Sequence, residues 1–171
     1  CSLEGEPTGG KIVEEISFSP EEVFVRGTRE KVDSVQSVIF IIDVSGAEGT
    51  LSKSIRLEPV DSKRNPVQGV TVSPEEVEVT VSLTFPQKDV PVEVVLADNV
   101  QDEVEIMLLE PSQVTIEGPG YLLKEIDTIK TAEIQLEDVG LPSTVEAPLI
   151  FPEEVKPVQH RFAKVRIFPV E

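Results

Sequence analysis

The sequence predicts a mainly β protein built from two tandem small β-rich modules, each with one short α-helix. Three observations predict this fold class: an apolar set dominated by Val, Ile and Leu, strict alternation of apolar and polar residues, and an internal repeat. Branched side chains such as Val and Ile suit a pleated, half-buried surface. The 14 prolines lie between and beside the apolar runs, where they end strands or start them.

Alternation is clearest near the middle of the chain, where Glu78, Thr80 and Ser82 separate four apolar residues. Those four residues are Val77, Val79, Val81 and Leu83. The same period of two recurs at Val23–Val25, Val90–Leu96 and Val114–Ile116. A period of two is typical of strands with one buried and one wet face, so it predicts antiparallel pairing.

Two segments break the alternation and predict helices. In Thr28–Val38 the apolar residues Val32, Val35 and Val38 recur every third position, and Thr28 is a candidate N-cap. In Gly118–Ile129 the apolar residues also recur at three or four; they are Leu122, Leu123, Ile126 and Ile129. We expect two amphipathic helices of about two to three turns, each with one face on a sheet.

An internal repeat organises the chain. The stretch SPEEVFVRG at Ser19–Gly27 matches EPSQVTIEG at Glu110–Gly118, so that Pro20 corresponds to Pro111. Further on, IIDVSG at Ile41–Gly46 corresponds to EIQLED at Glu133–Asp138, and NPVQG corresponds to KPVQH. The predicted domains are residues 1–84 and 85–171. The first has only Cys1–Leu3 where the second has Val90–Leu96, so we expect a piece cut from a longer array.

The stretch SPEEV occurs at Ser19–Val23 and again at Ser73–Val77, and FPEEV at Phe151–Val155 comes close to a third copy. Proline fixes φ and biases the preceding residue towards extended backbone. We therefore predict that each SPEEV is a turn that launches a strand. FPEEV is predicted to be a chance likeness, aligned with Leu57–Asp61 of the first repeat.

Charge limits the classes of partner. The net charge is −17, which repels phosphate backbones and anionic lipid headgroups. Nucleic acid and direct membrane insertion are therefore not expected, whereas a basic protein partner or a merely solvated acidic surface fits. Cys1 is the only cysteine, which excludes an internal disulfide and a thiolate metal cluster. A lipoprotein beginning at Cys1 is conceivable, but the repeat places Cys1 inside a strand.

The order of these motifs resembles the YbbR domain family over nearly the whole chain, most closely at Leu3–Gly27 and Gly69–Leu83. The resemblance implies repeated units outside a bacterial membrane, with a fold similar to the C-terminal domain of a ribosomal protein of the L25 kind. It also implies an anchor outside this piece and a protein partner, a membrane diadenylate cyclase that makes cyclic di-AMP. The second repeat departs from the pattern, because it lacks the Asp-Ser-Gly turn and a second SPEEV before Val165.

The sequence contains no recognisable arrangement of catalytic residues. We therefore predict no catalytic, cofactor-binding or metal-binding residues and expect no cofactor. His160 is the only histidine, and no nucleophile elbow accompanies it. Ser45 follows Asp43 and precedes a glycine, which is turn chemistry. Neither GGK at Gly9–Lys11 nor GPG at Gly118–Gly120 has the spacing of a phosphate loop.

Adjacent glutamates are frequent, but neighbours in a strand point to opposite faces and do not converge on one ion. The pairs are Glu14–Glu15, Glu21–Glu22, Glu75–Glu76 and Glu153–Glu154. We expect a solvated acidic face that discourages edge-to-edge aggregation of strands.

Three functional hypotheses follow. The first is a non-catalytic, elongated extracytoplasmic module that binds and regulates a membrane diadenylate cyclase. The second is a passive or calcium-stiffened spacer or adhesion module of the cell envelope. The third, a hydrolase using acidic residues, would need activity that depends on Glu21, Glu75 or His160.

Overall fold

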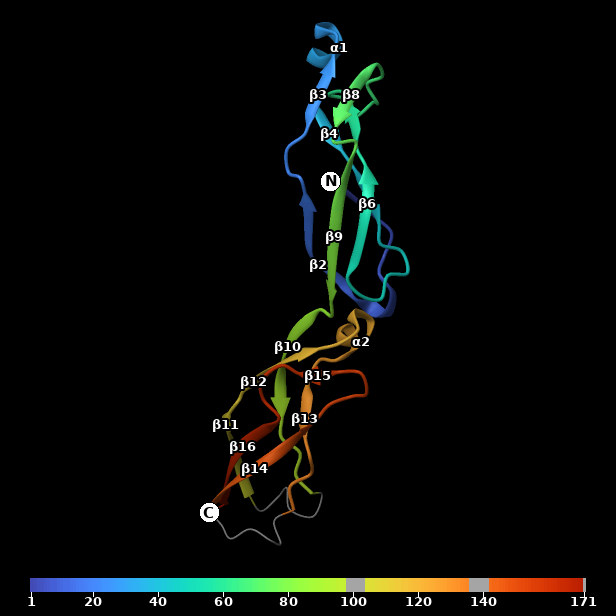
Figure 1. The fold of residues 1–171 in the computed structure, drawn as a ribbon. Helices are drawn as coiled ribbons and strands as arrows, with labels where there is room; N and C mark the ends of the chain where they lie inside the picture. The colour runs from blue at the N-terminus through green and yellow to red at the C-terminus, as the bar shows by residue number, and fades with distance from the viewer. Residues whose placement is uncertain (98–103, 136–141, 171) are drawn as a thin grey trace. The chain divides into compact units, whose positions relative to one another are not determined.

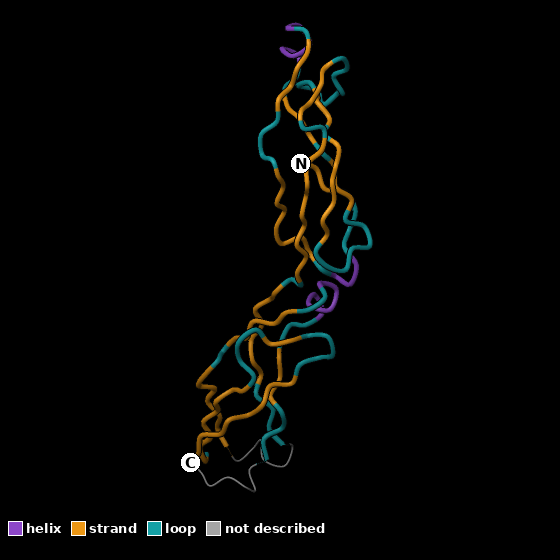
Figure 2. Tube along the Cα trace, viewed as in Figure 1, coloured by secondary structure: helices purple, strands orange, loops and turns teal. Residues whose placement is uncertain are grey.

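The computed structural model describes residues 1–97, 104–135 and 142–170 (Figure 1). Contacts between Cα atoms divide the chain into two compact units, Cys1–Thr84 and Phe85–Glu171, called unit 1 and unit 2 below. Strands dominate both units, and the two α-helices are short (Figure 2). The prediction of a mainly β protein with one short α-helix in each module is confirmed.

Unit 1 is assembled from several small sheets. Its elements are β1 (Ser2–Glu4), the 3-10 turn η1 (Thr8–Gly10), β2 (Ile12–Ser19), β3 (Phe24–Gly27), α1 (Arg29–Ser34), β4 (Ser37–Ile39), β5 (Ile41–Asp43), β6 (Leu51–Arg56), β7 (Glu58–Val60), β8 (Val70–Ser73) and β9 (Glu76–Thr84). β9 lies between β2 and β6 and is antiparallel to both. β3 pairs with β8 and β4 with β7, again antiparallel. β1 and β5 are parallel, so the prediction of antiparallel pairing does not extend to every strand.

The core of unit 1 confirms the alternation. Val77, Val79 and Val81 on β9 are buried, whereas Glu78 between them is exposed. They pack with Phe40, Ile42 and Val44 from β5 and its neighbours. The inward face of β9 therefore supplies half of this cluster.

Both SPEEV stretches connect strands, as predicted. The first lies between the end of β2 at Ser19 and the start of β3 at Phe24. The second follows the end of β8 at Ser73, and β9 begins within it at Glu76. The peptide bonds before Pro20, Pro74 and Pro111 are all cis, and Pro111 is the residue that the repeat aligned with Pro20.

Unit 2 is organised around one sheet. Its elements are β10 (Gln87–Glu93), β11 (Val104–Glu110), β12 (Gln113–Glu117), α2 (Gly120–Glu125), β13 (Ile129–Thr131), β14 (Ser143–Ile150), β15 (Lys156–Pro157) and β16 (Phe162–Pro169). The seven strands follow the order β11-β16-β14-β13-β10-β12-β15. β10 changes partner along its length, pairing antiparallel with β12 and then parallel with β13 through Val92 and Glu93. It ends at Glu93, before the predicted end at Leu96.

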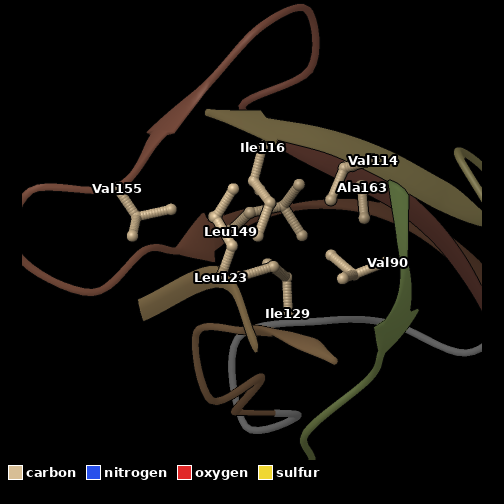
Figure 3. Close-up of a cluster of buried hydrophobic side chains, with 8 residues drawn as sticks. All are labelled: Val90, Val114, Ile116, Leu123, Ile129, Leu149, Val155 and Ala163. Carbon is tan, nitrogen blue, oxygen red and sulfur yellow. The ribbon is translucent and has the colours of Figure 1, made fainter. Parts of the chain in front are cut away.

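The main core of unit 2 gathers side chains from most of its elements (Figure 3). Ile116 on β12 and Val90 on β10 have no exposed surface, and Leu123 of α2 points into the same cluster. The other buried members are Val114, Ile129, Leu149, Val155 and Ala163. One face of α2 therefore packs on the sheet, as the sequence predicts.

The helices differ from their predictions in length, capping and burial. Each spans six residues, fewer than the expected two to three turns. Thr28 is the N-cap of α1, but its side chain makes no capping hydrogen bond; its carbonyl accepts from Val32 N at 2.9 Å. No residue of α1 is buried, and its apolar residue Val32 is only half-buried. The face of α1 that was expected to pack on a sheet therefore buries little apolar surface.

The repeat is visible in the turns. Arg64 N donates to Asp61 O at 3.0 Å, and Val155 N donates to Pro152 O at 3.2 Å. Asp61 and Pro152 are 91 residues apart in the sequence, as are Arg64 and Val155, and this is also the spacing between Pro20 and Pro111. Phe151–Val155 therefore corresponds to Val60–Arg64, three residues later than the predicted Leu57–Asp61.

Candidate functional site

Ser45 belongs to a turn and is not poised as a nucleophile. Its backbone N–H donates to Asp43 Oδ1 at 2.8 Å, and Gly46 has a φ of 71°. Hydrogen bonds from the side chain and the backbone of Ser45 hold the pKa of Asp43 below its ordinary value. The prediction of turn chemistry is confirmed.

Gly5 is a part of this turn that the sequence did not single out. It has a φ of 79°, and a Cβ atom there would collide with Ser45 Oγ and lie 2.7 Å from Asp43 Oδ1. Only glycine fits this close approach of two chain segments. Asp43, Ser45 and Gly5 therefore shape the backbone.

The second repeat has Glu133–Asp138 in place of this turn, and residues 136–138 lie outside the described residues. Leu96 and Ile134 form a parallel β-bridge, as Leu3 and Ile42 do in unit 1. The pairing is thus kept where the turn residues differ.

Of the other singled-out residues, His160 and Gly9 lie on the surface, whereas Gly118 is buried. His160 is exposed in the loop before β16, and Gly9 and Gly10 form η1 with positive φ values. Gly118 is close to the chain at Glu154, where a Cβ atom would lie 3.0 Å from the carbonyl oxygen. The structure thus gives GPG a packing role at the start of α2.

The adjacent glutamates are exposed at all four places predicted from the sequence, including Glu21–Glu22 and Glu75–Glu76. In residues 1–97, 104–135 and 142–170 no group of three or more acidic, His or Cys side chains is placed to hold a metal ion. Glu75 Oε2 lies 3.7 Å from Arg56 Nη2, and Ser54 donates to Glu76 at 2.9 Å. Both glutamates thus have partners on β6.

Open grooves lie on both units. The groove of unit 1 has a volume of about 660 Å³ and runs along β7 and β8; it is lined by Arg56–Pro59, Pro66–Val72 and Glu75. The groove of unit 2 has a volume of about 720 Å³ and lies beside β13; it is lined by Val95, Glu125–Thr131, Glu133 and Ile150–Pro152. Aliphatic residues such as Ile126, Ile129 and Ile150 make the second groove the more apolar.

The surface of unit 2 also exposes apolar side chains on its strands, which the sequence reading did not single out. Met107 on β11 is 54% exposed and Phe162 on β16 is 56% exposed. The signal is present in the sequence. Ile106–Leu109 is a continuous apolar run, and in an antiparallel strand such a run places apolar side chains on both faces.

No helix among the described residues is long and apolar enough to span a membrane.

The chain is similar in sequence to known proteins. The chain is 28% identical over 142 residues to the CdaA regulatory protein CdaR of Bacillus subtilis (strain 168). That match covers 82% of this chain and 29% of the relative, so the chain spans less than a third of its length. A solved YbbR-like protein from Streptococcus pneumoniae TIGR4 is 17% identical, with a TM-score of 0.39, covering 99% of this chain and 91% of the other. The profile of the family described as YbbR-like protein matches residues 2–81 and again residues 90–167, and the chain belongs to that family.

Proposed function

We propose that this chain is a non-catalytic extracytoplasmic interaction module of a membrane-anchored protein that binds and regulates a membrane diadenylate cyclase. The observation that carries the proposal is the similarity to the CdaA regulatory protein CdaR over 142 residues. The family resemblance supplies the finer terms, namely the cyclase, the location outside the membrane and the anchor.

The arrangement of the chain supports a role in binding. The turn residues Asp43 and Ser45 are engaged in local hydrogen bonds, and His160 is exposed on a loop. The exposed apolar residues of unit 2 and its groove offer surface to a protein partner. A net charge of −17 opposes nucleic acids and anionic lipids as partners.

Co-expression tests this function. The diadenylate cyclase of the source organism is produced with the gene product that carries this chain, or with a version lacking residues 1–171, and cyclic di-AMP is measured in the cells. A difference between the two cultures at equal cyclase abundance supports regulation through this chain. Equal cyclic di-AMP would end the proposal, and the spacer hypothesis would then take its place.

A hydrolase is tested separately on the purified gene product. Replacement of Glu21, Glu75 and His160 one at a time should leave any background hydrolysis unchanged, since each of these side chains is exposed. Loss of a measurable activity in any one variant would contradict the non-catalytic assignment.

A further inference from the structure

The two units allow one surface to be compared between two copies of the same sheet. β2, β9 and β6 of unit 1 correspond to β11, β16 and β14 of unit 2, with the last strand in the middle of each set (Figure 1). In register, Ser17 pairs with Thr80 as Met107 pairs with Arg166. Likewise Ser54 pairs with Glu78 as Glu146 pairs with Lys164. The comparison is therefore made residue by residue.

The solvent-facing side chains of the first set, here called the outer face of unit 1, are polar. They are Glu15, Ser17, Ser19, Ser52, Ser54, Arg56, Glu76, Glu78, Thr80 and Ser82. Ser52 Oγ and Thr80 Oγ1 lie 3.2 Å apart, within hydrogen-bond distance. This face matches the prediction of a wet face on an antiparallel sheet.

The corresponding outer face of unit 2 carries large apolar side chains and two cations among its acidic residues. It comprises Glu105, Met107, Glu110, Thr144, Glu146, Pro148, Phe162, Lys164, Arg166 and Phe168. Met107 takes the place of Ser17, and Phe168 takes the place of Ser82. The Arg166 guanidinium carbon lies 5.2 Å from the centre of the Phe168 ring. Met, Phe and Arg are enriched at protein interfaces, so this substitution pattern is that of a contact surface.

Two positions of this face also gain a positive charge. Lys164 and Arg166 stand where unit 1 has Glu78 and Thr80, in a chain with a net charge of −17. Lys164 Nζ lies 3.1 Å from Glu110 Oε1, and this contact raises the pKa of Lys164. Within the described residues Arg166 makes no ion pair. Its guanidinium is therefore open to a carboxylate from outside.

The face continues onto an open edge. β11 stands at the end of the seven-stranded order, and its outer edge pairs with no other described strand. Its apolar run includes Ile106 and Leu109, which are 42% and 45% exposed. β11 also carries Glu105 and Glu110, and the corresponding strand of unit 1, β2, carries Glu14, Glu15 and two serines and exposes Ile12 and Phe18. An open edge with exposed apolar side chains is a site for association.

We infer that the outer face of unit 2 is the docking surface for the partner protein, and that the partner presents an apolar surface with a carboxylate opposite Arg166. This inference rests on the proposed function. Contact with the partner buries the apolar side chains of Met107 and Phe162. A bidentate pair between the Arg166 guanidinium and the partner's carboxylate fixes the orientation of the partner.

Charge argues against the other two occupants. A second copy would bring together two chains of −17 each, and such a net charge keeps proteins apart. An anionic membrane would meet Glu146 on the face, Glu105 and Glu110 on β11, and the same net charge. Both remain distinct outcomes of the experiment below.

The experiment is site-specific photo-crosslinking in cells that produce the full gene product together with the diadenylate cyclase. A photo-reactive amino acid replaces Met107 in one culture and Ser17, its counterpart in unit 1, in the other. We expect a covalent adduct with the cyclase from position 107 in at least about tenfold excess over position 17, the ratio that one interfacial anchor provides.

Each other outcome overturns the inference. Equal adducts from both positions, an adduct with a second copy of the chain, or an adduct with lipid each assigns the face differently. No adduct at position 107 also overturns it, and cyclic di-AMP measured in the same cells separates the two failures. A normal cyclic di-AMP response without an adduct leaves the proposed function standing, whereas an absent response removes it as well.

Charge reversal provides a second readout. Arg166→Glu should weaken cyclase binding by about tenfold or more, because it removes the cation and repels the carboxylate. Thr80→Glu, at the corresponding position of unit 1, should leave binding unchanged. Thermal unfolding of both purified gene products checks that the folds are intact. Equal binding by the Arg166→Glu variant would contradict the assigned role of Arg166.

Discussion

Pro20 and Pro74 lie on facing chain segments that interrupt one antiparallel ladder, and each directly follows the last paired residue of its own strand. β2 pairs with β9 as far as Ser19 and Glu78, and β3 pairs with β8 from Phe24 and Ser73 onwards. Four residues separate the two ladders on each strand, so Pro20–Val23 lies opposite Pro74–Val77 and the register is the same on both sides. The two SPEEV stretches are therefore a matched pair of interruptions.

Inserting one glycine after Glu21 should destabilise unit 1, because it lengthens only one side of this break. The register of β3 on β8 would slip by one residue, and a slip of one turns side chains such as Val25 to the opposite face. We expect a loss of about 1–3 kcal/mol in the free energy of unfolding, comparable with exposing one aliphatic side chain. Urea unfolding followed by circular dichroism measures it.

A compensating insertion tests the cause. A second glycine after Glu75 lengthens the facing strand by the same amount, so the doubly inserted protein should regain most of the lost stability. If the double insertion is less stable than either single insertion, the two stretches are not matched and the relationship is wrong.

The sequence predicted the strands and the turns of this ladder because their signals are local. Alternation at Val77–Leu83 and proline at Pro20 and Pro74 act on the residues that carry them. The position of the two SPEEV stretches opposite each other could not be predicted in the same way. It depends on which strands pair across more than forty residues, and no single stretch encodes that.

The two helices show the limit of periodicity. A spacing of three or four predicted both, but α1 ends at Ser34 and α2 at Glu125, after six residues each. Short helices depend on packing rather than on propensity. The next apolar residues, Val35 and Ile126, have extended backbone and lie in the connections to β4 and β13.

Asp43→Ala should lower the melting temperature at neutral pH, because it removes the acceptor for Ser45 N. The folded protein has a lowered Asp43 pKa, so the stabilisation is present above the ordinary value of 3.8 and is lost as the pH falls through the folded pKa. The difference in melting temperature between wild type and variant should therefore shrink below about pH 3.8. Thermal unfolding over a pH series measures this.

Asp43→Asn is the matched control. The amide oxygen keeps an acceptor in place but does not titrate in this range. Its melting temperature should lie between those of wild type and Asp43→Ala. An Asp43→Ala difference that stays constant from neutral pH to below pH 3.8 would show that the carboxylate charge does not stabilise the turn.

Leu123→Ala should cost about 2–5 kcal/mol of the free energy of unfolding, because Leu123 is the buried residue of α2 and packs in the core shown in Figure 3. Val32→Ala in α1 is the counterpart and should cost less than about 1.5 kcal/mol, since Val32 is only half-buried. Urea unfolding of the two variants compares them. Equal losses would mean that α1 is anchored as firmly as α2.

Lys88→Met should lower the free energy of unfolding by about 1.5–3 kcal/mol, the range for hydrogen bonds to a charged group. Lys88 Nζ donates to the carbonyl oxygens of Leu123 at 3.0 Å and Ile126 at 2.6 Å, at the carboxyl end of the helix, where a cation is favourable. Methionine keeps the apolar stem, so the loss reports the ammonium group. Hydrogen exchange of the α2 amides should accelerate together with the fall in stability.

Lys130→Met is the control for the general effect of removing a positive charge from this acidic chain. Lys130 Nζ lies 3.8 Å from Glu93 Oε2 in an exposed pair, and such pairs contribute about 0–1 kcal/mol. Both variants raise the negative charge equally, so long-range repulsion is the same in each. A Lys88→Met loss no greater than that of Lys130→Met would show that the cation at the end of α2 acts only through net charge.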